Sequence, residues 1–213
     1  MHLLPERPAR AARRRSLTAD TYTDAELDAL REVANIGSST AATAMSSLIG
    51  VPVEVSAPSA RAMQLTDAIE RVGPAEMVVT TVVVPVTGDL EALVLMVLAP
   101  HTEEGACGLI GVERDSDLGR SALVELGNIL AASYLGALST LTGLSLEPSP
   151  PEGVRDMLRA VLSSALIRDD GEGDVLILES TLSVAVAECS PTFLFVPSGG
   201  SVEEIIERLR VPA

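Results

Sequence analysis

Residues 28–58 read DALREVANIGSSTAATAMSSLIGVPVEVSAP, and residues 121–151 read SALVELGNILAASYLGALSTLTGLSLEPSPP. The two segments align without a gap at an offset of 93 positions, and twelve of the 31 aligned positions are identical. Self-similarity of this kind indicates a repeated structural unit. The sequence therefore predicts a duplicated molecule, with one copy of the unit in each half of the chain.

Each copy begins with a long helical pattern and continues into a β-hairpin. In the first half, the patterns predict helices over 24–48, 60–71 and 102–110 and strands over 53–55, 76–86 and 90–98. In the second half, they predict helices over 117–141, 154–167 and 201–209 and strands over 144–146, 175–188 and 192–196. Helices followed by hairpins predict an α+β protein with an antiparallel sheet.

A Glu–Asn pair recurs inside both long helices. Glu32 and Asn35 are three residues apart, so they share one helix face, and Glu125 and Asn128 repeat the pair. Asn is a poor helix former because its amide competes with the backbone. Its recurrence at the same interior position therefore indicates a role. The alternative is structural, with each Asn hydrogen-bonded to a nearby loop and each Glu a solvated surface charge.

The chemistry open to such a pair is restricted, since Glu and Asn provide neither a strong nucleophile nor a complete metal site. An Asn amide can hold a water molecule by donating and accepting hydrogen bonds. That is sufficient if a partner supplies an acyl-phosphate, a bound Mg²⁺ and a Lys, because phosphoryl transfer depends mainly on positioning and charge stabilisation. The Glu would then dock the partner by pairing with its Lys.

Both copies resemble the motif of the CheC/CheX/FliY family of chemotaxis phosphatases. That motif is Asp or Ser, three residues, Glu, two residues, Asn, twenty-two residues and Pro. Every spacing is met twice, in the first copy by Asp28, Glu32, Asn35 and Pro58 and in the second by Ser121, Glu125, Asn128 and Pro151. The resemblance implies a pseudo-twofold α+β domain in which two long helices display two equivalent sites on one face. The halves would span approximately 24–116 and 117–213.

The resemblance also implies a substrate and partners. The substrate would be the aspartyl-phosphate of phosphorylated CheY, and a second partner would be the receptor deamidase CheD. The family's CheD contact lies around the helix after the second motif, where Asp156 is the candidate residue. The alternative for Asp156 is an acidic residue in a first helical turn, favoured there by the helix dipole. The protein would need no cofactor of its own, because Mg²⁺ would arrive with the response regulator.

Two other functions remain open at the level of sequence. The protein could be a non-catalytic adaptor that binds CheD, CheY or both. It could also be a flagellar switch component similar to FliY, but the chain ends soon after its last predicted helix, which leaves little length for a further switch domain.

Charge and composition exclude several classes of function. The net charge is −15, and all fifteen basic residues are Arg, five of them within the first fifteen positions. We expect residues 1–22 to form a disordered basic tail, with the folded domain at 23–213. The acidic body should repel nucleic acid phosphates, and an aromatic content of 2% leaves no stacking platform for single strands.

The remaining features are those of an ordinary folded cytoplasmic protein. No apolar run approaches the ~20 residues of a membrane span, and the basic N-terminus lacks the apolar stretch of a secretory signal. Cys107 and Cys189 lack metal-type spacing and are expected to be small buried side chains. With only His2 and His101, no histidine-based zinc site or hydrolytic triad is expected.

Overall fold

The computed structural model describes residues 22–166 and 175–210. The helices are α1 (Asp24–Ile49), α2 (Leu65–Val72), α3 (Pro100–Ile110), α4 (Asp117–Thr142), α5 (Leu158–Leu166) and α6 (Gly199–Arg210), with a 3₁₀ turn η2 (Ala185–Ala187). The strands are β1 (Glu54–Val55), β2 (Ser59–Met63), β3 (Val78–Gly88), β4 (Ala92–Leu98), β5 (Leu146–Pro148), β6 (Glu152–Met157), β7 (Val175–Ser183) and β8 (Thr192–Pro197).

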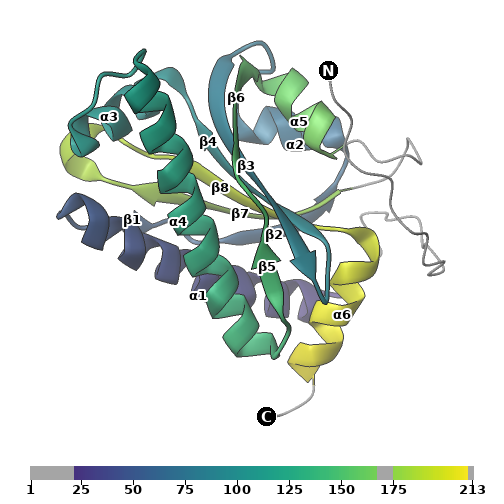
Figure 1. Cartoon of the computed structure of the whole chain (residues 1–213). Coiled ribbons are helices and arrows are strands. Elements are labelled where there is room, and N and C mark those ends of the chain that lie inside the picture. The colour runs from purple at the N-terminus through teal and green to yellow at the C-terminus, as the bar shows by residue number, and fades with distance from the viewer. Residues whose placement is uncertain (1–21, 167–174, 211–213) are drawn as a thin grey trace.

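The order of elements is the same in both halves. The run α1, β1, β2, α2, β3, β4, α3 is followed by α4, β5, β6, α5, β7, β8, α6 (Figure 1). All strands join one curled antiparallel sheet whose centre is the β4–β8 pair. The predicted α+β class with an antiparallel sheet is thereby confirmed.

The two halves exchange strands. β1 and β2 pair with β7 of the second half, and β5 and β6 pair with β3 of the first half. The register of the exchange is the same on both sides. Glu54 and Ser59 pair with Ser183 and Glu179, and their equivalents Glu147 and Glu152 pair with Thr87 and Val83, so the two partners are four residues apart in each half. The molecule therefore has a pseudo-twofold axis, and neither half contains its own complete sheet.

Helices cover both faces of the sheet. α1 and α4 pack against each other on one face, and α2 and α5 pack together on the other (Figure 1). The central strands send alternate side chains to the two sides: Val94 and Met96 of β4 lie in the core under α1 and α4, whereas Leu95 and Val97 lie in the core under α2 and α5. This double burial explains why 92–98 is a nearly continuous apolar run.

The predicted ends of the long helices are confirmed. Thr23 caps the start of α1 in a capping box with Glu26. Gly50 ends α1 with a φ of 73°, and its equivalent Gly143 ends α4 with a φ of 70°. This left-handed conformation is the usual helix C-cap and favours glycine. The two motif helices therefore have matched lengths and matched termini.

Two predicted helices begin too early. The helix predicted over 60–71 begins at Leu65, because 59–63 form β2, and the helix predicted over 154–167 begins at Leu158, because 152–157 form β6. Both segments contain residues that suit a helix, such as Ala, Arg and Met. Pairing with the hairpin of the other half overrides that local preference.

The remaining differences are local. The strand predicted over 175–188 ends at Ser183, and η2 follows it. The sequence predicts that Tyr22 belongs to the basic tail, but it is 9% exposed and is part of the core under α1 and α4. Residues 1–21, which hold the rest of that tail, lie outside the described residues.

Candidate functional site

The motif helices are held together at one close contact. A Cβ atom on Gly37 of α1 would lie 2.5 Å from Cε2 of the Tyr134 ring on α4, so only glycine allows the helices to approach this closely. Tyr134 is itself fixed between Phe193 and Phe195, with ring centroids 5.2 and 5.5 Å away. The motif side chains therefore project from a rigid pair of helices.

In the first copy, the structure places the motif residues on the outer face of α1. Asp28, Glu32 and Asn35 are exposed, whereas Val33 and Ala34 between them are buried in the core. Within the described part of the chain, neither Glu32 nor Asn35 has a side-chain hydrogen bond or ion pair. Asp28 is ion-paired with Arg31 on the same helix.

In the second copy, the arrangement on α4 is equivalent. Ser121 and Glu125 are exposed and Asn128 is half-buried, whereas Leu126 and Gly127 between them are buried. Among residues 22–166 and 175–210, the side chains of Glu125 and Asn128 make no hydrogen bond or ion pair. The amide of each motif Asn is therefore available to water or to a partner, and it is not used to tie down a loop.

The motif prolines occupy equivalent connections. Pro58 lies between β1 and β2, Pro151 lies between β5 and β6, and both are half-buried. α1 packs against β1 and β2, and α4 packs against β5 and β6. Each proline thus lies beside the helix of its own copy, at the point where the chain turns from one short exchanged strand into the next.

Asp156 lies in β6, opposite Val79 of β3, and its side chain is exposed. Its Oδ1 accepts a hydrogen bond of 2.7 Å from the backbone N–H of Met157. Because α5 begins only at Leu158, Asp156 is not in a first helical turn, and the helix-dipole explanation for it is wrong. Its role as a partner contact stays a prediction.

Sequence reasoning did not find a polar cluster between β6 and the start of α4. Glu103 of α3 is only 3% exposed and accepts a hydrogen bond of 2.7 Å from Thr80 Oγ1. Arg155 of β6 lies 4.0 Å from Glu103 and 3.1 Å from Asp115. Hydrogen bonds from Arg114 and then Arg155 hold the pKa of the Asp115 carboxyl below its usual value. No sequence motif signals this cluster, because its members are far apart in the chain.

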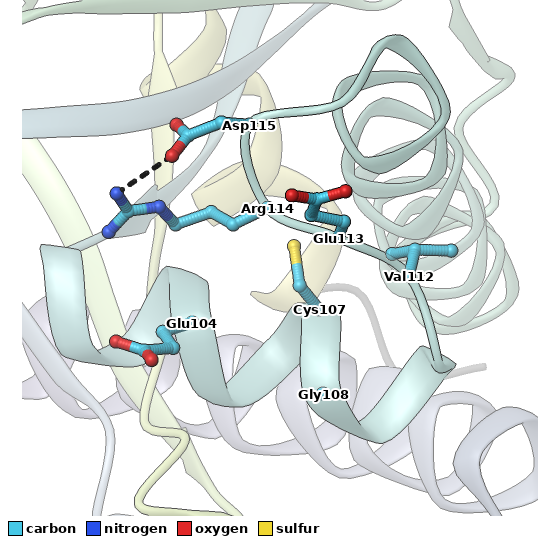
Figure 2. Close-up of a pocket in the computed structure, with 7 residues that line it drawn as sticks. All are labelled: Glu104, Cys107, Gly108, Val112, Glu113, Arg114 and Asp115. Atoms are coloured by element: carbon cyan, nitrogen blue, oxygen red, sulfur yellow. Dashed lines mark hydrogen bonds and ion pairs between the residues drawn. The ribbon is translucent and has the colours of Figure 1, made fainter.

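A pocket of about 390 Å³ lies next to this cluster and is shown in Figure 2. Its lining residues are Glu104, Cys107, Gly108, Val112, Glu113, Arg114 and Asp115. Burial, and then the nearby Glu103 carboxylate, raise the pKa of the Cys107 thiol. The thiol is therefore protonated at neutral pH and is a poor nucleophile. None of the eight motif residues lines this pocket, so the pocket is not part of the site formed by the Glu–Asn pairs.

Over residues 22–166 and 175–210, no three His, Cys, Asp or Glu side chains gather in a way that could hold a metal ion. α4 is long and apolar enough to pass a simple test for a membrane span. In the structure it packs against α1 and the sheet, as the central helix of a folded core does.

Comparisons with known proteins match the duplicated segments. The model of the CheC-like family matches residues 26–60 and 118–155, which contain all the motif residues of the two copies. The chain is 37% identical over 164 residues to the CheY-P phosphatase CheC of Bacillus subtilis (strain 168). That alignment covers 73% of this chain and 78% of the relative.

Solved structures share the fold. FliY of Thermotoga maritima superposes with a TM-score of 0.72 at 23% identity, covering 89% of this chain and 98% of that chain. CheX in the CheX–CheY–BeF3–Mg complex of Borrelia burgdorferi superposes with a TM-score of 0.52 at 16% identity, covering 80% of this chain and 97% of that chain. At these identities the likeness shows the fold alone.

Proposed function

Because the chain belongs to the CheC-like family, we propose that it is a phosphatase that hydrolyses the aspartyl-phosphate of a CheY-type response regulator. The named activity of the Bacillus subtilis relative supports this reaction. The observation that carries the proposal is that the amides of Asn35, which is exposed, and Asn128, which is half-buried, make no intramolecular hydrogen bond within the described residues.

Docking is the first task of the site. Glu32 and Glu125 are exposed and have no ion-pair partner within the described residues, so each carboxylate can accept hydrogen bonds from a Lys of the incoming receiver. Charge-assisted hydrogen bonds of this kind are stronger than neutral ones. The Glu lies one helical turn before the Asn, so docking would bring the amide beside the phosphorylated carboxylate.

Hydrolysis is the second task. The Asn amide would hold a water molecule in line with the bond between phosphorus and the aspartyl oxygen. The water oxygen bonds to phosphorus, the electron pair of the broken bond returns to the aspartyl carboxylate, and the water proton leaves with the phosphate or to solvent. Mg²⁺ bound to the receiver would neutralise the phosphoryl oxygens as part of the substrate. Asn cannot accept the proton, so its contribution is positioning.

The alternative is an adaptor that binds CheD or phosphorylated CheY without turnover. The exposed position of Asp156 on β6 favours the adaptor, because this strand offers an additional surface for a partner. The two functions are compatible, but the surfaces adjoin, because a Cβ on Gly153 at the start of β6 would lie 2.7 Å from Val124 on α4. We propose CheD binding at β6 as an addition to the phosphatase activity, in line with the family's properties.

The test is phosphate release from Mg²⁺-loaded, acetyl-phosphate-treated receiver, with and without CheD. Asn35→Ala together with Asn128→Ala should abolish stimulated release, while each single variant retains part of it. Thr66→Ala, an exposed polar substitution on α2, is the matched control. Wild-type rates in the double variant would refute the mechanism. Tight receiver or CheD binding by the wild-type protein without phosphate release would favour the adaptor.

A further inference from the structure

A large apolar side chain is exposed next to the second motif. Leu118, in the first turn of α4, is 67% exposed. Single exposed apolar residues are common on protein surfaces and need no explanation by themselves. The position of Leu118 relative to the motif is what distinguishes it from the other exposed apolar residues of this chain.

Leu118 lies on the motif face of α4. At about 100° per residue, it is about 20° from Glu125 and about 80° from Asn128 around the helix axis, with Ser121 between these limits. By the same geometry, the exposed Leu141 near the other end of α4 is about 160° from Glu125. Leu118 therefore extends the line of motif residues toward the helix N-terminus, whereas Leu141 does not.

The start of α4 is held in place, so the exposure of Leu118 is not that of a frayed end. The Ser116 side chain caps the helix by accepting a hydrogen bond of 2.9 Å from the N–H of Gly119. A Cβ atom on Gly119 would clash with the carbonyl oxygen of Glu113, so the helix packs directly against the preceding loop. An anchored side chain loses less conformational freedom on binding than one on a mobile segment.

The first copy has a different surface at the equivalent positions. Ala25 corresponds to Leu118 at the offset of 93, and it provides no comparable apolar side chain. Asp28 of the first motif is ion-paired with Arg31, where the second copy has Ser121 and the half-buried Val124. The two copies thus share the Glu–Asn pair and differ in the residues around it.

We propose that Leu118 is an apolar anchor for the response regulator at the second site, with no counterpart at the first. The inference rests on the proposed function. Its occupant is an apolar patch on the receiver surface beside the phosphorylation pocket. Ten residues of helix place Leu118 about 15 Å from Asn128 along the axis. A standard interface of about 800 Å² per partner has a radius of about 16 Å, so one docked receiver can cover both. Leu118 acts on binding and does not touch the reacting atoms.

The experiment isolates each site before testing Leu118. Glu32→Arg with Asn35→Ala disables the first site, and Glu125→Arg with Asn128→Ala disables the second. Leu118→Ala is then introduced into each background. We expect KM for the phosphorylated receiver to rise about 5–10-fold with little change in kcat when only the second site works, because burial of a Leu side chain contributes that much to binding. When only the first site works, neither constant should change.

A binding measurement tests whether Leu118 contacts the receiver even if one isolated site has a low kcat. The probe is the unphosphorylated receiver loaded with Mg²⁺ and beryllium fluoride, and Kd should rise by the same 5–10-fold only in the second-site background. Leu118→Met should restore binding, and Leu141→Ala, a 40% exposed leucine on the opposite side of α4, is the matched control.

Each result has a definite meaning. An unchanged Kd for Leu118→Ala in the second-site background overturns the anchor, as does an equal loss in both backgrounds or a loss in kcat alone. Continued phosphate release by Asn35→Ala with Asn128→Ala overturns the proposed function instead, so the two failures are distinguishable.

Discussion

Leu95 of β4 and Leu194 of β8 are equivalent residues of the two halves, and they pair directly with each other across the centre of the sheet. The equivalence follows from the registers, because Val83 pairs with Leu95, and Glu179, the counterpart of Val83, pairs with Leu194. The pseudo-twofold axis therefore passes between the two leucines. Both are fully buried in the core under α2 and α5.

The first prediction concerns this central pair. Leu194→Ala should lower the free energy of unfolding by about 2–5 kcal/mol, since it removes a fully buried side chain and leaves a cavity where both halves meet. Urea denaturation followed by circular dichroism measures the change. Val186→Ala is the control, because Val186 is 74% exposed and its truncation should have little effect. Equal effects of the two substitutions would contradict the burial of Leu194 at the junction of the halves.

The second prediction concerns the contact between α1 and α4. Gly37→Ala should destabilise the protein by about 1–3 kcal/mol, because the new methyl group overlaps the Tyr134 ring, which Phe193 and Phe195 prevent from moving. Gly136→Ala should stabilise it by about 0.5–1 kcal/mol, since a Cβ there meets nothing within 4 Å and Ala is the better helix former. Opposite signs in thermal unfolding are expected, and a shared sign would refute the packing.

The third prediction concerns a polar contact found in one half only. Ser38 Oγ and Ser180 Oγ lie 2.7 Å apart in a buried position, whereas the equivalent residues of the other half are Ala131 and Val84. Ser38→Ala alone should cost about 1–3 kcal/mol, because the Ser180 hydroxyl is left buried without its partner.

Adding Ser180→Val to that variant should recover most of this loss, since the pair then copies the apolar solution of the other half. The double-mutant cycle, measured by urea denaturation, is the test. Strictly additive losses would show that the two hydroxyls are not coupled.

The fourth prediction concerns alkaline pH. Burial, and then the neighbouring Cys107, raise the pKa of the Cys189 thiol to about 11 from an ordinary value of 9.0. The folded protein holds this proton more tightly than the unfolded chain, so the associated stability is complete below pH 9 and is lost as pH rises toward 11. The loss should be on the order of 2–3 kcal/mol.

The chain contains no Lys, but burial also raises the pKa of the Cys107 thiol and of the Tyr134 hydroxyl, so the comparison is made with Cys189→Ala, which retains both groups. The free energy of unfolding should therefore fall between pH 9 and 11 in the wild-type protein and fall less in Cys189→Ala. Urea titrations at fixed pH values measure it, with the slope between pH 7 and 8 as the baseline. Identical alkaline slopes in the two proteins would rule out Cys189 as the source.

The parts of the fold that follow from sequence are those specified by local signals. The apolar periodicity of 24–48, the Thr23 cap and the glycine at each helix end predict α1 and α4 closely. The hairpin strands also follow from their Val and Leu content. β2 and β6 do not, because their strand conformation depends on a hairpin in the other half, and nothing within 59–63 or 152–157 encodes that partner.

The site divides in the same way. Spacing alone places Glu32 and Asn35 on one helix face, and the structure shows this face to be exposed. Spacing cannot show which neighbouring side chains remain outside the core. The sequence alone does not distinguish Leu118 from a core leucine, because its exposure depends on where α4 lies against α1 and the sheet. The cluster around Glu103 requires three distant segments to meet, which no local pattern predicts.

The reciprocal strand exchange constrains how such a molecule could have originated. A polypeptide carrying one copy would have to borrow β1 and β2 from a second identical molecule, and its two sites would remain identical. When two copies are joined in one chain, each half receives its exchanged strands from the other half of the same molecule. The sequences of the two copies can then change independently. Leu118 is equivalent to Ala25, and Ser38 is equivalent to Ala131. A symmetric homodimer of identical chains could not have different residues at equivalent positions.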